Sequence, residues 1–78
     1  MEAREIMERF AKAVSNILKR FSEAGKETID LYDVWIESSI PMDIMEEVIE
    51  KGMAEIPLEV RELQLKGKTV WRREKYEE

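Results

Sequence analysis

The sequence predicts an α+β domain made of three helices and a C-terminal β-hairpin. Apolar residues recur every three or four positions through much of the first two thirds of the chain, which is the spacing of amphipathic helices. Further along, Lys66-Gly67-Lys68 separates two short runs of strand-forming residues, as in a hairpin. The chain has 78 residues and no linker-like stretch, so we expect one domain over residues 1–78, with a frayed tail at 75–78.

The first helix is predicted over Ala3–Phe21. Its apolar stripe includes Ile6, Phe10 and Val14, which recur at helical spacing. Gly25 follows shortly after and is a natural C-terminal stop, because glycine adopts the left-handed conformation that often ends a helix. One face of this helix should therefore form one side of the core.

A very short strand and a second helix should follow. Thr28 and Ile29 are expected to form the strand, and Asp30 is suited to cap a helix that runs to about Glu37. The inward face of this helix is expected to hold Leu31, Val34 and Trp35.

A third helix is predicted over Pro41–Lys51, after a turn at Ser38–Ile40. Pro41 suits the first helical position, because the N–H that proline lacks has no partner there, and Gly52 should end the helix. The segment 53–59 remains open between helix, strand and loop. The buried face of the third helix is expected to hold Ile44, Met45, Val48 and Ile49.

The hairpin is predicted to begin with a strand over Val60–Leu65, joined by a three-residue loop to its partner. This register places Leu65 opposite Thr69 and Leu63 opposite Trp71. It also places Glu62 opposite Arg72, on the other face of the hairpin from Leu63 and Trp71. A two-residue loop would instead place Trp71 opposite Glu62, which is a poorer pairing.

Composition limits the function classes. The chain has no Cys and no His, so the usual general base and the best nucleophile are both missing, and we expect no enzyme and no cofactor. The lack of Cys excludes disulfides and suits a reducing cytoplasm. No signal peptide or membrane span is evident, and no small-molecule substrate is indicated. A charged fraction of 40% is typical of proteins from hot environments.

The strongest functional signal is a reversal of charge between neighbouring segments. Residues 23–59 contain eleven acidic and two basic residues, a balance of −9, whereas residues 60–75 contain six basic and two acidic residues, a balance of +4. The first segment would repel a nucleic acid and the second would attract one. The acidic residues of the third helix are Asp43, Glu46, Glu47 and Glu50, and the basic residues of the hairpin are Arg61, Lys66, Lys68, Arg72, Arg73 and Lys75.

Each of these clusters has an ordinary alternative. The four acids share one helix face and offer oxygen ligands to Mg²⁺ or Ca²⁺, but they lack the loop carbonyls that such ions use, so we expect a solvated face and no metal. The basic cluster could contact phosphates or pair with the chain's own carboxylates, and the sequence favours neither. Trp71 is expected in the core, with a partly exposed interface position as the alternative.

The expected order is helix, short strand, helix, tight turn, helix and hairpin, and the residues that define it are Ile29, Leu31–Ile36, the Ile40-Pro41 turn, Glu50-Lys51-Gly52 and the hairpin around Gly67. This order resembles the winged-helix family of helix-turn-helix domains. In that family the helix after the turn enters the DNA major groove and the hairpin, or wing, touches the backbone. The resemblance implies that Pro41–Lys51 is the groove-reading helix and that residues 66–68 form the wing tip. This helix departs from the family, because it carries four acids and no Arg.

The leading hypothesis is a non-enzymatic interaction module that binds protein, including a second copy of itself in a homodimer. Its acidic helix 41–51 and basic hairpin 60–75 would form the contact surface, with Trp71 as a further interface candidate. The alternative is a small DNA-binding transcriptional regulator that contacts phosphates through the basic wing. A third interpretation is a structural protein whose charges serve solubility and heat stability alone.

Overall fold

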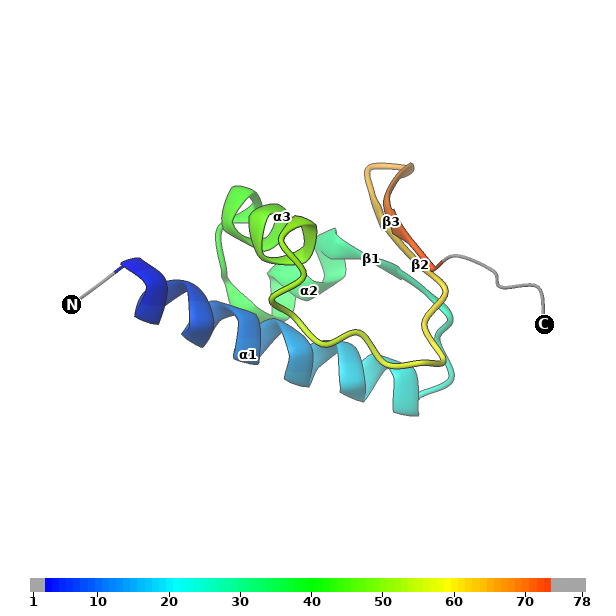
Figure 1. Cartoon of the computed structure of the whole chain (residues 1–78). Coiled ribbons are helices and arrows are strands. Elements are labelled where there is room, and N and C mark those ends of the chain that lie inside the picture. The colour runs from blue at the N-terminus through cyan, green and yellow to red at the C-terminus, as the bar shows by residue number, and fades with distance from the viewer. Residues whose placement is uncertain (1–2, 74–78) are drawn as a thin grey trace.

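A computed structural model describes residues 3–73 of the chain and confirms the α+β prediction (Figure 1). Three helices precede a hairpin, and the two strands of the hairpin join the short strand to form a three-stranded sheet. The expected fraying of residues 75–78 lies outside the described residues. The elements are α1 (Ala3–Glu23), β1 (Thr28–Asp30), α2 (Leu31–Ser38), α3 (Met42–Glu50), β2 (Glu62–Leu65) and β3 (Lys68–Arg72).

The long helix α1 supports the rest of the fold, with α2 and α3 packed on the same side of it (Figure 1). Val14 and Leu18 of α1 are completely buried, as the apolar stripe predicts. The helix extends two residues beyond the predicted end at Phe21. It closes where Gly25 adopts a φ of +93° and donates its N–H to the carbonyl of Ser22 at 2.9 Å.

Asp30 caps α2 as predicted, because its side chain accepts a hydrogen bond from the backbone N–H of Tyr32 at 2.8 Å. The prediction that Trp35 is buried is wrong, since 39% of this residue is exposed. The reason is the helical repeat. Leu31 and Val34 define the buried face, and Trp35 lies one step around the helix from Val34.

The third helix begins one residue later than predicted. Pro41 is the N-cap, with φ −53° and ψ 139°, rather than the first helical residue. Met45, Val48 and Ile49 are buried as predicted, whereas Ile44 is half-buried. The segment 53–59 forms neither helix nor strand and runs back along α1 (Figure 1).

The sheet has the order β1-β2-β3. The short strand β1 pairs in parallel with β2, and this pairing brings Ile29 next to Leu63 at a distance of 34 residues along the chain. The strands β2 and β3 are antiparallel. Ile29 and Leu63 are both buried, so the sheet packs its inner face against the helices.

The hairpin keeps the predicted pairings of Leu63 with Trp71 and of Glu62 with Arg72, but the predicted pairing of Leu65 with Thr69 is wrong, because Leu65 pairs with Lys68. Leu63 lies opposite Trp71 as predicted, but the turn contains two residues, Lys66 (φ 54°) and Gly67 (φ 79°), instead of three. Positive φ at both positions is the signature of a type I′ turn, which matches the twist of the paired strands. Val70 is an extra residue on β3, a β-bulge, and it restores the register that a two-residue turn would otherwise shift.

The predicted strand Val60–Leu65 begins two residues too early, because β2 covers Glu62–Leu65. Val60 and Arg61 precede β2, and Val60 is completely buried while Arg61 donates its N–H to the carbonyl of Glu27 at 2.7 Å.

Among the residues that the structure describes, no helix has both the length and the apolar character needed to cross a membrane.

Candidate interaction site on the third helix and the hairpin

The acidic face of α3 is largely open to solvent. Asp43, Glu46 and Glu50 are exposed, and Glu47 is half-buried. Glu47 forms an ion pair with Lys51 at 3.0 Å, one turn further along the helix. Asp43 accepts a hydrogen bond from the N–H of Ile44 at 3.0 Å. The two carboxylates with the fewest local partners are therefore Glu46 and Glu50.

Metal binding was the other interpretation of these four acids. Within residues 3–73, no group of three or more acidic side chains has an arrangement that could hold a metal ion. Three of the acids are exposed on the outside of the helix, and the fourth, Glu47, pairs with Lys51.

The side chain of Arg73 forms hydrogen bonds with the chain's own backbone. Its Nε donates to the carbonyl of Val60 at 3.1 Å, and one of its terminal nitrogens donates to the carbonyls of Pro57 at 2.9 Å and Ile56 at 3.3 Å. Its guanidinium also lies 5.0 Å from the centre of the Trp71 ring, a cation–π contact. Arg73 thus fastens the end of β3 to the irregular segment that precedes β2.

Arg61 is also engaged, though weakly. It lies 4.0 Å from a carboxylate oxygen of Glu27, and both side chains are exposed. A pair with this geometry contributes little to stability. Lys75, the last of the six predicted basic contacts, lies outside the described residues.

The solvent side of the hairpin carries a small polar network. Glu62 accepts hydrogen bonds from the Thr69 hydroxyl and from the Gln64 amide, the latter at 3.2 Å. These hydrogen bonds, together with the positive charge of Arg72 on the paired strand, lower the pKa of Glu62 below its ordinary value of 4.5. The predicted pairing of Glu62 with Arg72 is therefore present in the register and acts through charge.

Three basic residues remain exposed along β3 and its turn, namely Lys66, Lys68 and Arg72. Among residues 3–73, none of the three forms an ion pair within 4.0 Å. They project from the two-residue turn and the strand that follows it. This cluster, which we call the hairpin tip, is the part of the predicted basic site that stays available.

The acidic face of α3 and the hairpin meet in one groove of about 260 Å³. The groove is lined by Glu46 and Glu50, by the largely buried Ile49 between them, and by Val70 at the bulge of β3. Val70 is 39% exposed, so the groove has an apolar floor beside an acidic wall. The groove brings the acidic face of α3 beside the hairpin, while its lining residues include none of the basic residues of the hairpin.

The sequence left two positions open for Trp71, one in the core and one at a partly exposed interface, and the structure gives it an intermediate exposure. It is half-buried and packs against the core cluster on one side, with the Arg73 guanidinium over its ring. Its place opposite Leu63 explains the inward packing.

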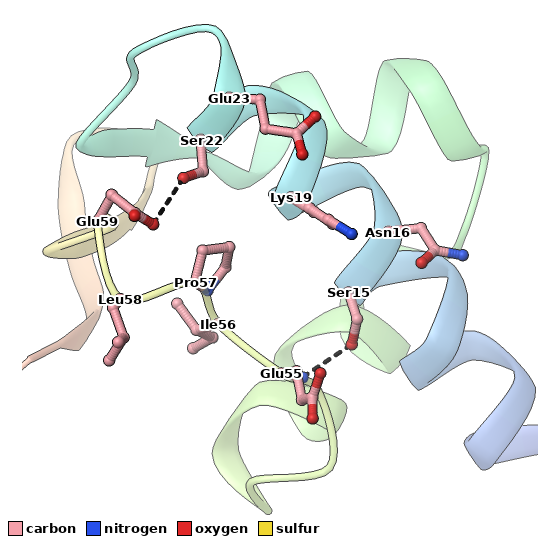
Figure 2. Close-up of a pocket in the computed structure, with 10 residues that line it drawn as sticks. All are labelled: Ser15, Asn16, Lys19, Ser22, Glu23, Glu55, Ile56, Pro57, Leu58 and Glu59. Carbon is pink, nitrogen blue, oxygen red and sulfur yellow. Dashed lines mark hydrogen bonds between the residues drawn. The ribbon is translucent and has the colours of Figure 1, made fainter.

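A second groove, which sequence reasoning missed, separates α1 from the segment 55–59 (Figure 2). It has a volume of about 740 Å³ and two bridging hydrogen bonds: the Glu55 N–H donates to Ser15 at 2.8 Å, and the Ser22 hydroxyl donates to Glu59 at 3.2 Å. Leu58 on its rim is 81% exposed and turns away from α1 (Figure 2).

Comparison with protein-family models, with curated proteins and with solved structures finds no match to this chain. The resemblance to winged-helix domains therefore rests on the order of the elements, and the function must be argued from the surfaces themselves.

Proposed function

We propose that this protein is a non-enzymatic interaction module that binds another protein through the α3–hairpin groove. The observation that carries the proposal is the groove itself, in which Glu46 and Glu50 stand beside the exposed Val70 and the floor residue Ile49. We also propose the cytoplasm as the compartment, because a chain without cysteine has no need of an oxidising one.

The chemistry of the groove favours a partner that presents lysine or arginine. The aliphatic stem of such a side chain can lie on Val70 and Ile49, while its charged end reaches the carboxylates of α3. Lys66 and Lys68 at the hairpin tip favour an acidic region beside the basic one on the partner. A second copy of the chain has both charges and is one candidate, in a head-to-tail arrangement.

Capture from an extract of the source organism tests the proposal. The bait is the immobilised protein, and the variant Glu46→Gln/Glu50→Gln removes two charges while it keeps the size of both side chains. Two exposed charge pairs at roughly 0.5–1 kcal/mol each should lower the retention of a true partner by about five- to thirty-fold.

The control is Glu5→Gln/Glu8→Gln, which also removes two negative charges, but from an exposed part of α1. The proposal requires a protein that the wild type and this control retain and the α3 variant loses. It is overturned if every retained protein responds to both variants equally.

The second candidate function, DNA binding, has a specific observation in its favour. Lys66, Lys68 and Arg72 are exposed and form no ion pair within the described residues, so they remain available for phosphate contacts. Against it, Glu46 and Glu50 line the groove that a duplex would have to approach, where they would repel its phosphates.

Fluorescence anisotropy with a labelled duplex separates the two candidates. Three phosphate contacts would give log K a slope of roughly −3 against log salt, and Lys66→Ala/Lys68→Ala/Arg72→Ala should abolish binding. A duplex that does not bind at low salt excludes DNA as the ligand and leaves the proposal for a protein partner unaffected.

A further inference from the structure

The strand β3 is a free edge of the sheet. The strand order is β1-β2-β3, and within residues 3–73 no strand pairs with the far side of β3. An edge strand presents backbone N–H and C=O groups that its own sheet does not use, and an extended segment of a partner can pair with them. This edge therefore offers backbone hydrogen bonds to a partner.

The register of the hairpin identifies the backbone groups that face away from β2. In an antiparallel pair of strands, residues that exchange hydrogen bonds alternate with residues whose N–H and C=O groups point outward. Lys68 is of the first kind, because it closes the two-residue turn. Arg73 is also of the first kind, since its N–H donates to the carbonyl of Arg61 at 2.9 Å. Thr69 and Arg72, which adjoin them, therefore direct their backbone groups toward the free edge.

The bulge preserves the spacing of these outward groups. Thr69 and Arg72 are three residues apart in β3, with the extra residue Val70 between them. Their partners in β2 are Gln64 and Glu62, which are two residues apart. The outward groups thus keep the interval of about 7 Å that a regular strand repeats every two residues, and one extended segment can pair with both.

The α3–hairpin groove opens along the same edge. Its lining includes Val70 of β3 and no residue of β2, and α3 packs against β3. The neighbouring Trp71 packs against the core, so this part of β3 faces the helices. A strand added to β3 would therefore run past Glu46 and Glu50, with every second side chain on the side of α3.

The two acids match the repeat of an extended chain. Glu46 and Glu50 are four residues apart, which corresponds to about 6 Å along a helix. Side chains i and i+2 of a strand share one face and are about 7 Å apart. Two basic side chains on one face can each reach one acid, while their aliphatic stems lie on Val70 and Ile49.

The solvent face of the edge selects a different side chain. Arg72 is exposed and lies opposite Glu62 on that face. A residue placed beside Arg72 should be neutral or acidic, because a basic one would meet a like charge. A second copy of β3 fits poorly, since Lys68 and Arg72 would bring like charges into one short strand pair.

We propose that the partner of the α3–hairpin groove is an extended segment with basic residues at every second position, which pairs with β3 as a fourth strand. This inference rests on the proposed function and names the kind of partner that uses the groove. The basic side chains face Glu46 and Glu50, and the backbone of the segment pairs with Thr69 and Arg72.

Two labelled peptides of equal composition test the pattern by fluorescence anisotropy. In one, lysine alternates with threonine over about eight residues, and in the other the lysines form one block and the threonines another. The alternating peptide should bind at least about fivefold more tightly, because it places its charges on one face. Equal affinities overturn the proposal, since attraction between a basic peptide and an acidic protein would then explain both.

N-methylation of the alternating peptide tests the backbone pairing. One version is methylated on the backbone nitrogens of its lysines and the other on those of its threonines, and these two sets of N–H groups point to opposite edges of an extended chain. One version should keep its affinity and the other should lose about tenfold, because one set of N–H groups faces β3. Equal affinities of the two versions overturn the pairing.

The variants Arg72→Pro and Arg72→Ala test the same pairing from the side of the protein. Both remove the charge, but proline also removes the N–H that faces the free edge, a position where edge strands tolerate proline. Arg72→Pro should bind the alternating peptide several-fold more weakly than Arg72→Ala, and circular dichroism verifies the fold. In the wild type, amide exchange at Thr69 and Arg72 should slow when the peptide binds, and unchanged exchange at both overturns the proposal.

The acidic variants separate this inference from the proposed function. The alternating peptide should lose at least about fivefold in affinity for Glu46→Gln/Glu50→Gln and keep its affinity for Glu5→Gln/Glu8→Gln. Equal binding to both variants overturns the inference, whereas the proposed function is judged by capture. A captured protein that requires Glu46 and Glu50, together with peptides that do not bind, overturns the extended partner and leaves the proposed function intact.

Discussion

The helices α2 and α3 are neighbours of nearly equal length, with eight and nine residues, yet their solvent faces are opposite in character. Each buries one apolar face against α1 and the sheet. The outer face of α2 is apolar, with Tyr32, Trp35 and Ile36, whereas that of α3 is acidic, with Asp43, Glu46 and Glu50. The core requires only the inner faces, so the outer faces are where a difference in binding can be encoded.

The two helices also differ in how their ends are held. Asp30 caps α2 through its side chain, and the Arg20–Glu37 ion pair ties the end of α2 to α1. The N-cap of α3 is Pro41, which makes no side-chain hydrogen bond, and the neighbouring hairpin is fastened by Arg73 instead. The outer face of α2 therefore belongs to a helix that is capped and also tied to α1, whereas α3 has no side-chain cap and the hairpin beside it depends on Arg73.

The largest expected effect separates the inner and outer faces of α2. Leu31→Ala should destabilise the protein by about 2–5 kcal/mol, because Leu31 is completely buried and its loss leaves a cavity. Ile36→Ala on the outer face should change the free energy of unfolding by less than about 0.5 kcal/mol in dilute protein. Urea denaturation measures the free energy of unfolding of both variants. If Ile36→Ala loses as much as Leu31→Ala, the outer face of α2 also stabilises the monomer.

The next effect concerns the α3 side of the comparison. Arg73→Met keeps an apolar side chain beside Trp71 but removes the side-chain hydrogen bonds that Arg73 donates to the carbonyls of Val60, Pro57 and Ile56. We expect a loss of about 1–3 kcal/mol in denaturant unfolding. Amide hydrogen exchange should rise in the segment 53–61 and stay unchanged in α2. Faster exchange in α2 would show that the two regions are not held independently.

A smaller effect should isolate the cap of α2. Asp30→Ala removes the acceptor for the Tyr32 N–H and should cost about 1 kcal/mol, whereas Asp30→Asn keeps an acceptor and should cost less. Thermal unfolding in dilute protein measures this difference. If both variants lose the same amount, the charge of Asp30 rather than its hydrogen bond stabilises the helix.

The smallest expected effect is a pH dependence at the hairpin. The folded-state pKa of Glu62 is lowered, so its stabilising contribution is present above its ordinary pKa of 4.5 and is lost as the pH falls through the folded value. The wild type should therefore have a higher melting temperature than Glu62→Gln near neutral pH. The difference between the two melting temperatures should decrease below about pH 4.5. If this difference in melting temperature does not change with pH, the charge of Glu62 does not contribute to stability.

Much of the inner structure could be predicted from the sequence. The stripe of α1, the Asp30 cap and the Leu63–Trp71 pairing follow from spacing and local chemistry, which act over a few residues. Trp35 could not be placed, because eight residues make barely two helical turns and several choices of inward face fit so short a pattern.

The groove between α3 and the hairpin and the role of Arg73 could not be predicted for another reason. Both depend on contacts between segments far apart in the chain, which no local pattern encodes. The two-residue turn was missed because a bulge at Val70 corrects the register, and a bulge is favoured by tertiary packing as much as by sequence. Positive φ at Lys66 gave no signal, since lysine is not a typical residue there.

The bulge at Val70 has a consequence for how this molecule can associate. The strand β3 is an edge of the sheet, and an edge strand can template the backbone of another chain into a growing sheet. A bulge interrupts the regular ladder, and Lys68 and Arg72 on either side of it add charge to the edge. The bulge and these charges thereby disfavour strand-by-strand polymerisation through β3, although this edge of the sheet has no neighbouring strand among the described residues.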